Sequence, residues 1–205
     1  MTNYEVIKII VLGNSGIGKT AFIKQICNTP FYGEKTIGVE FDCKIITYNN
    51  CEYKLQFLDC TGDNRFRNII RPYYKLTTFV IIIFNADNLS YKSDILYWME
   101  ELNFTKEAYK YNILLIGLYT HQIYLEDIEK YIESKYMRYI FLNKKDIVNN
   151  NLINNNLIQI IIEMYNCTFR TRIENNNKYT KSLKEKDNRV CYGYNRDCYG
   201  YCNIM

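Results

Sequence analysis

An eight-residue stretch near the N-terminus constrains this chain more than any other part of the sequence. It fits the pattern G-x-x-x-x-G-K-[ST], which is typical of a loop that wraps around phosphate groups. The apolar run Val6 to Leu12 before it predicts a buried strand, and Lys19 to Cys27 after it predicts a helix. This order points backbone N–H groups and a helix N-terminus at an anion. We therefore predict that phosphate is bound by Gly13, Asn14, Ser15, Gly16, Ile17, Gly18, Lys19 and Thr20.

The glycines and the two polar residues that end this stretch have separate expected roles. Gly13, Gly16 and Gly18 allow the backbone to wrap closely around phosphate oxygens. The ammonium group of Lys19 supplies a positive charge for the outer phosphates, and the hydroxyl of Thr20 is placed to coordinate Mg²⁺. The alternative is a glycine-rich turn that fits the pattern by chance, and the strand and helix on its two sides disfavour it.

The rest of the sequence alternates apolar strands with amphipathic helices. Apolar runs and alternating patterns predict strands at 6–12, 39–45, 53–57, 79–84, 113–118 and 137–142. Asn49 and Asn50 separate the second strand from the third, which predicts an antiparallel hairpin because Asn tolerates positive φ. We therefore predict an α/β domain with a mostly parallel six-stranded sheet, one antiparallel edge strand and helices on both faces. Its ligand should lie beyond the carboxyl ends of the strands.

Composition and charge limit the kind of protein further. With 205 residues, of which 48% are hydrophobic, the chain can build one domain with a substantial core. A net charge of +4 is too small to argue for nucleic acid, so we expect no nucleic-acid partner. Apolar periodicity continues in the stripe Ile153, Leu157 and Ile161 and stops near residue 166. We predict a domain at 1–165 and a flexible, basic tail at 166–205.

Three further motifs, taken with the phosphate-binding loop, resemble the Ras superfamily of small GTPases and, within it, the Rab branch. The sequence T-I-G-V-E-F at 36–41 resembles the end of Rab switch I. The sequence L-D-C-T-G at 58–62, followed by Arg65 and Phe66, resembles switch II, and R-P-Y-Y at 71–74 resembles the helix after it. The resemblance covers roughly residues 5 to 165 and implies the fold of a P-loop GTPase.

This resemblance implies that the ligand is GTP or GDP and that Mg²⁺ is the metal. Thr36 would close over the γ-phosphate and complete the Mg²⁺ shell begun by Thr20. Asp59 would hold the same ion through its water shell, and the N–H of Gly62 would contact the γ-phosphate. Loss of that phosphate would release both switches. The alternative for Thr36 and Asp59 is an ordinary loop threonine and an ordinary aspartate at a strand end.

The residue after Gly62 departs from the Rab pattern. Rabs carry a glutamine here that orients the attacking water, and this chain carries Asp63. A glutamine side chain both donates and accepts hydrogen bonds, whereas an ionised aspartate only accepts them. Asp63 also places negative charge near a polyphosphate. We therefore expect weak intrinsic hydrolysis.

The guanine-reading motif N-K-x-D is missing from its expected place. At the end of the fifth predicted strand the chain has Leu118, followed by Tyr119, Thr120 and His121. Tyr119 could stack on a base, but His121 cannot reproduce the two hydrogen bonds that an aspartate accepts from guanine. His121 could also simply begin a helix. The sequence N-K-K-D at 143–146 spells the motif one strand later, either by accident or as a compensating contact from Asp146.

The C-terminus predicts a lipid anchor. The chain ends in Cys202-Asn203-Ile204-Met205, a C-a-a-X pattern in which a terminal Met favours farnesyl. A single prenyl chain anchors a protein reversibly, and basic residues upstream strengthen its attachment to an anionic leaflet. We therefore expect a lipid-anchored protein on the cytoplasmic face of a membrane, with a cytosolic pool. Most Rabs end in two cysteines, so the modifying enzyme stays open.

These patterns together predict a Rab-like small GTPase that binds GTP or GDP with Mg²⁺ and hydrolyses GTP slowly. The resemblance alone implies a switch in vesicle traffic, with effectors, an exchange factor and a GTPase-activating protein bound through the switch regions. The alternative is a pseudo-GTPase, a binding module that holds nucleotide weakly or without base choice. A P-loop kinase or ATPase is disfavoured by the pairing of Thr36 with the D-x-x-G sequence at 59–62.

Overall fold

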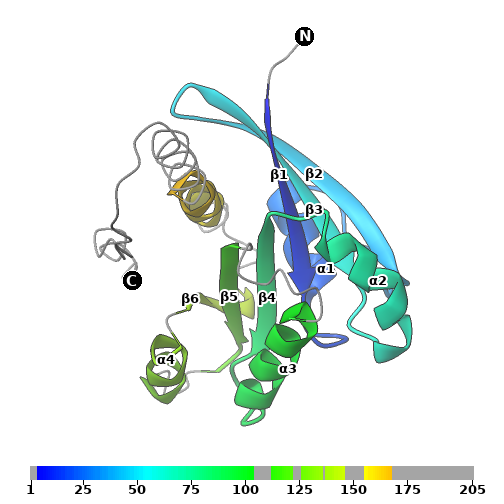
Figure 1. Cartoon of the computed structure of the whole chain (residues 1–205), viewed down its shortest axis with the longest axis vertical. Coiled ribbons are helices and arrows are strands. Elements are labelled where there is room, and N and C mark those ends of the chain that lie inside the picture. The colour runs from blue at the N-terminus through cyan, green and yellow to red at the C-terminus, as the bar shows by residue number, and fades with distance from the viewer. Residues whose placement is uncertain (1–3, 104–111, 122–125, 136, 146–154, 168–205) are drawn as a thin grey trace, which may run out of the picture. The chain divides into compact units, whose positions relative to one another are not determined.

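Six strands form one sheet in the computed structural model of this protein, which describes residues 4–103, 112–121, 126–135, 137–145 and 155–167 (Figure 1). The strands are β1 (Glu5–Leu12), β2 (Val39–Tyr48), β3 (Cys51–Cys60), β4 (Phe79–Asn85), β5 (Asn112–Tyr119) and β6 (Arg138–Asn143). Their order in the sheet is β2-β3-β1-β4-β5-β6. Only β2 runs antiparallel to its neighbour, which confirms the predicted mostly parallel sheet with one antiparallel edge strand.

The helices fall between the strands, as the apolar spacing predicts. They are α1 (Lys19–Cys27), the short 3-10 helix η1 (Asn64–Phe66), α2 (Arg67–Tyr74), α3 (Tyr91–Asn103) and α4 (Glu126–Glu133). Residues 155–167 are also helical, and Leu157 and Ile161 of the predicted stripe are buried. Ile153 of the same predicted stripe lies outside the described residues.

The hairpin between β2 and β3 follows from two asparagines. Asn49 and Asn50 have φ values of 49° and 62°, the left-handed conformation that a two-residue hairpin turn requires. Tyr48 pairs with Cys51 directly beside the turn, so both strands are longer than their alternating patterns predict. The extra residues continue the ladder because the turn leaves no unpaired loop between the strands.

Both faces of the sheet are buried by helices. Ile10 and Leu12 of β1 belong to one apolar cluster with residues of α2, α3 and α4, including Trp98. Ile9 and Val11 point to the opposite face and are also fully buried. α1 contacts β2 and β3 outside that cluster, and Figure 1 shows it across the sheet from α3. The predicted helices on both faces are therefore confirmed.

The chain divides into two compact units, residues 1–159 and residues 160–205. The boundary near residue 165 remains a prediction. The flexible tail with Cys202 also remains one, because residues 168–205 lie outside the described part of the chain. Within the described ranges, the helices are too short or too polar to cross a membrane.

The core predicts a sharp contrast between an apolar residue in β4 and another in the turn after it. Ile82 of β4 is 0% exposed within the cluster, whereas Leu89 after the same strand is 95% exposed. Ile82→Ala should lower the free energy of unfolding by about 2–5 kcal/mol through lost burial and a residual cavity. Leu89→Ala should change it by less than about 0.5 kcal/mol. Urea unfolding of both variants measures the difference, and similar losses would contradict the assigned core.

Candidate phosphate and metal site

The loop between β1 and α1 has the backbone conformation of an anion-binding loop. Gly13, Gly16 and Gly18 all have positive φ, at 146°, 77° and 106°. Gly18 is the N-cap of α1 and has no side-chain oxygen that could accept from the first N–H groups of the helix. These N–H groups therefore stay available to an anion at the positive end of the helix dipole.

Lys19 is buried beneath this loop and holds it closed. Its Nζ donates to the carbonyl oxygens of Gly13 and Asn14, at 2.9 Å each. Burial lowers the pKa of Lys19 from its ordinary value of 10.5 to about 8, against the opposing effect of the Asp59 charge. The ammonium group is thus poorly solvated, and an anion in the loop would favour its charged form.

Three predicted residues from distant parts of the sequence meet in one cluster of oxygens. The hydroxyl of Thr20, in the first turn of α1, lies 2.8 Å from the hydroxyl of Thr36. Both hydroxyls donate to Oδ2 of Asp59 near the end of β3, Thr20 at 2.6 Å and Thr36 at 3.1 Å. The fold therefore brings together the three residues that sequence analysis assigns to Mg²⁺.

The second carboxylate oxygen of Asp59 is available to a ligand. Oδ1 is buried, and none of the described residues forms a hydrogen bond with it. Burial raises the pKa of Asp59, although the hydrogen bonds from Thr20 and Thr36 oppose the shift. A buried carboxylate beside two hydroxyls is a hard oxygen donor set, which fits Mg²⁺. Among the described residues, no three histidine, cysteine, aspartate or glutamate side chains lie together as metal ligands. The candidate metal site is therefore the set of two hydroxyls and one carboxylate.

Gly62 packs directly on the phosphate-binding loop. A Cβ at this position would clash with backbone atoms of Gly13, Asn14 and Ser15, so the site requires glycine here. The N–H of Thr61 donates to the carbonyl oxygen of Gly38 at 2.9 Å, which ties the end of β3 to the start of β2. The segments that resemble the two switches are therefore joined to each other and to the loop.

Asp63 is engaged by its own neighbour. Its carboxylate accepts the backbone N–H of Arg65 at 3.0 Å and pairs with the guanidinium at 2.6 Å. The hydrogen bonds from Arg65 lower the pKa of Asp63 to about 2. Asp63 thus stays ionised, caps η1, and has no proton to donate to a water molecule.

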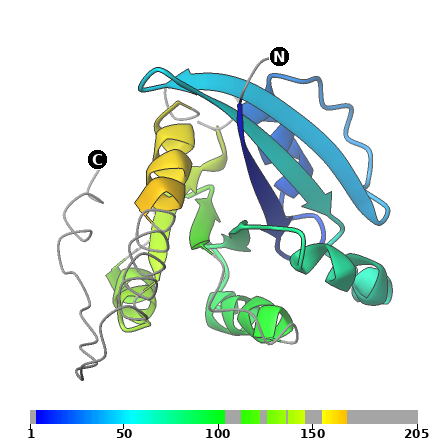
Figure 2. The same ribbon diagram turned by 45° about the horizontal axis from the view of Figure 1, so that its top comes forward.

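A cavity of about 530 Å³ lies over these groups. It is lined by the phosphate-binding loop, the start of α1, residues 60–62 and the segment that joins α1 to β2, drawn in blue in Figure 2. Sequence analysis missed Phe31, Gly33, Glu34 and Lys35 of that segment, because a loop without periodicity carries no signal for its direction. It also missed Trp98, whose indole N–H donates to the Asn14 side chain at 3.0 Å.

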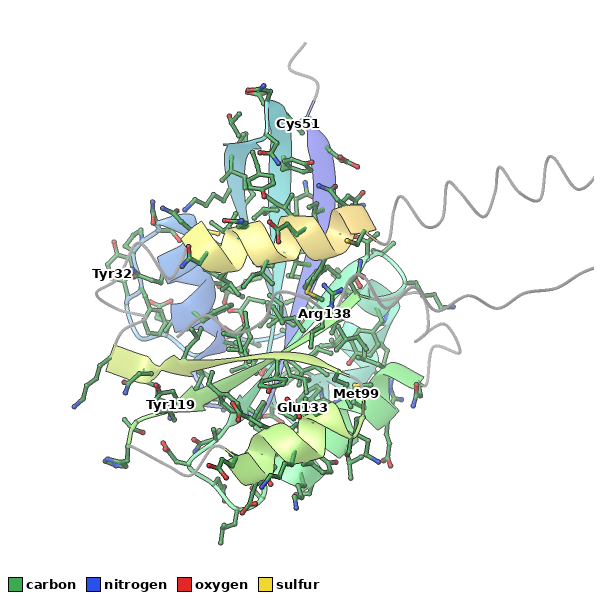
Figure 3. All side chains as sticks on the ribbon, turned by 90° about the vertical axis from the view of Figure 1, so that its left-hand side faces the viewer. Tyr32, Cys51, Met99, Tyr119, Glu133 and Arg138 are labelled. Atoms are coloured by element: carbon green, nitrogen blue, oxygen red, sulfur yellow. The ribbon has the colours of Figure 1, made fainter. Side chains whose placement is uncertain are left out.

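The residues expected near a base are not among those that line this cavity, although Leu118 lies beside the lining residue Gly18. Leu118 is buried, Tyr119 is half-buried against the apolar cluster at the end of β5, and His121 is exposed (Tyr119 is labelled in Figure 3). Thr120 is anchored instead, since its N–H and hydroxyl donate to Asp87 at 2.9 and 2.5 Å. Their role in reading a base stays a prediction.

The later N-K-K-D sequence begins beside this strand end. Asn143 of β6 pairs with Tyr119 of β5 across the sheet. The Asn143 side chain accepts the backbone N–H of Lys145 at 2.9 Å, a local turn that occupies its oxygen. Asp146, on which the compensating contact depends, lies outside the described residues.

Comparison with known proteins gives one consistent family. A sequence model of the Ras family matches residues 8–122. The chain is 30% identical to human Ras-related protein Rab-37 over 99 residues, covering 47% of this chain and 44% of Rab-37. It is 27% identical to Ras-related protein Rab-1 of Theileria annulata over 173 residues, 82% of this chain and 67% of that protein. Ras-related protein Rab-11B of Dictyostelium discoideum is 28% identical over 150 residues, which cover 69% of this chain and 67% of that protein.

Burial of the Lys19 ammonium should lower the stability of the ligand-free protein by an amount that depends on pH. Between pH 8 and 10.5 the unfolded chain binds more protons at Lys19 than the folded chain, so this contribution to stability rises with pH. Lys19→Met should be more stable than wild type below pH 8, by on the order of 1–3 kcal/mol, and should lose this advantage toward pH 10.5.

Urea unfolding of the two proteins at pH 7 and pH 9.5 measures this difference. Burial raises the pKa values of Cys27 and Cys60 to about 12, which lowers stability above pH 9 in both proteins. The effect of Cys27 is common to the two proteins, whereas the charge of Lys19 lowers the pKa of Cys60, so the titrations of Lys19 and Cys60 are coupled. Only the difference between wild type and Lys19→Met is therefore informative. An advantage that is constant across this pH range would show that Lys19 does not titrate as its burial implies.

Proposed function

The chain belongs to the Ras family, and from this we propose that it is a Rab-related small GTPase that binds GTP or GDP with Mg²⁺ and hydrolyses GTP slowly. The convergence of Thr20, Thr36 and Asp59 on one point below the phosphate-binding loop carries the proposal. Thr20 lies in α1, Thr36 in a loop and Asp59 at the end of β3. Packing of the core does not require three polar side chains from separate elements to meet, whereas binding of a metal ion does.

Each group of this site has a task in the proposed binding. Backbone N–H groups of the loop and the start of α1 would hold the phosphates, with the Lys19 ammonium beside them. The two hydroxyls and Asp59 would face the metal, either directly or through its water. Bound Mg²⁺ would supply neutralisation of charge on the phosphates. Lys19 would exchange its bonds to the Gly13 and Asn14 carbonyls for bonds to phosphate oxygens.

We further propose that this site works as a switch for membrane recruitment of effectors in vesicle traffic. Thr36 and Gly62 support this, because both lie against the loop and neither is part of a helix or strand. Exchange and GTPase-activating proteins would act on the same segments. Anchoring through prenylated Cys202 belongs to the same proposal and would place the protein on the cytoplasmic face of a membrane, with a cytosolic pool.

A pseudo-GTPase is the second candidate, and the base side of the site favours it. Leu118 and His121 replace the amide and carboxylate that read guanine in the family, and His121 is exposed. Each lost hydrogen bond to a base edge is worth about 1–3 kcal/mol. The phosphate side alone would then hold nucleotide with little choice of base.

Nucleotide binding through Lys19 tests the proposal. Calorimetric titration of GDP with Mg²⁺ should give binding to the wild type, and Lys19→Met should weaken it about 100-fold through lost charge-assisted hydrogen bonds. Lys8→Ala, which removes an exposed lysine of β1, is the matched control and should bind like the wild type. Equal affinity in all three proteins would refute the assigned site. ATP competing as well as GTP would select the pseudo-GTPase.

The pairing of Asp63 with Arg65 predicts how hydrolysis responds to mutation. Asp63→Gln restores a side chain that can both donate to and accept from water, so single-turnover GTP hydrolysis should rise about tenfold or more. Arg65→Ala is the control, because it frees the Asp63 carboxylate without giving it a donor. A similar gain in both variants would mean that the ion pair, and not the missing donor, limits the rate.

A further inference from the structure

Two lysines stand among the residues that line the cavity, and the proposed binding uses only one of them. Lys19 is 6% exposed and tied to two loop carbonyls. Lys35 is exposed and comes from the segment that joins α1 to β2. Two cationic residues therefore line the cavity, one of them buried and the other exposed.

The backbone places Lys35 next to the oxygen cluster. It directly precedes Thr36, whose hydroxyl lies 2.8 Å from Thr20 and 3.1 Å from Asp59. Adjacent Cα atoms are about 3.8 Å apart, so this anchor also limits where Lys35 can lie. Gly33 and Gly38 flank the pair with φ values of 81° and 78°, conformations that favour glycine and turn the chain on either side.

Lys35 forms no ion pair with any of the described residues. In the parts of the chain that the structure describes, no carboxylate lies within ion-pair distance of its ammonium, whereas Arg65 is paired with Asp63. Glu34, the residue before Lys35, also lines the cavity, and its negative charge partly offsets the positive charge of Lys35. Lys35 lies close enough to Asp63 for its charge to contribute to the lowered pKa of that carboxyl.

A triphosphate needs such a cation more than a diphosphate does. It carries one more phosphate and more negative charge, and that phosphate lies at the end of the chain farthest from the base. Glu34 in the cavity lining adds negative charge, and so does Asp63, which directly follows the lining residue Gly62. Without a balancing charge, the site would repel the outer phosphate more strongly than the inner ones.

We propose that Lys35 is a second phosphate-binding cation, which gives this site its preference for nucleoside triphosphate over nucleoside diphosphate. The inference rests on the proposed function, since it assigns a specificity-determining residue to the same site. Lysine suits the task because its flexible stem can follow the outer phosphate while the backbone stays anchored at Thr36.

The test compares a non-hydrolysable GTP analogue with GDP by calorimetric titration in the presence of Mg²⁺. Lys35→Ala should weaken binding of the triphosphate about tenfold and binding of GDP less than about twofold, as expected for one lost charge-assisted contact. Lys35→Arg, which keeps the charge, should restore most of the preference. Lys75→Ala removes an exposed lysine after α2 and should leave both affinities unchanged. Raising the salt concentration should shrink the preference of the wild type and leave that of Lys35→Ala nearly constant.

The outcomes separate this inference from the function on which it rests. Equal losses for both nucleotides, or no loss, in Lys35→Ala would overturn the role of Lys35 while leaving nucleotide binding intact. Failure of the wild type to bind either nucleotide would refute the proposed function and this inference with it. Lys35→Gln provides a second uncharged variant, and thermal unfolding of each protein separates a binding defect from a folding defect.

Discussion

The hydrogen-bonded cluster of Thr20, Thr36 and Asp59 is the interaction on which the site depends. It joins the first turn of α1, the segment before β2 and the end of β3 through contacts of 2.6–3.1 Å. Because α1 contacts β2 and β3, the sheet holds two of the three partners in place and the loop brings the third. The same cluster leaves Oδ1 of Asp59 buried without a partner among the described residues, so its geometry suits a bound cation.

Two opposite charges, Asp59 in this cluster and Lys19 under the phosphate-binding loop, are buried at a cost to the stability of the ligand-free protein. Burial lowers the pKa of Lys19 and raises that of Asp59, which means that the fold disfavours the charged form of both. A folded chain that needs only a packed core would replace them with apolar residues. Their retention is understandable if phosphate and a divalent cation supply the missing counter-charges.

The phosphate side and the base side of the site differ in kind. Around the loop, Gly62 lies so close to the backbone that no other residue fits, and Lys19 donates to two loop carbonyls. At the end of β5, Asp87 anchors Thr120 while His121 is exposed. The N-terminus of α1 leaves backbone N–H groups available to phosphate, whereas the described residues at the end of β5 offer few fixed groups to a base.

The sequence by itself determined the features that depend on neighbours in the chain. Apolar runs predicted all six strands, two asparagines predicted the hairpin, and spacing alone identified the phosphate-binding loop, because each is decided by local periodicity or backbone preference. Only the tertiary structure decided that Lys35 and Phe31 line the cavity and that Trp98 reaches Asn14, 84 residues away. Such contacts depend on how the layers pack and on the direction of a loop without periodicity, and neither is encoded in the spacing of adjacent residues.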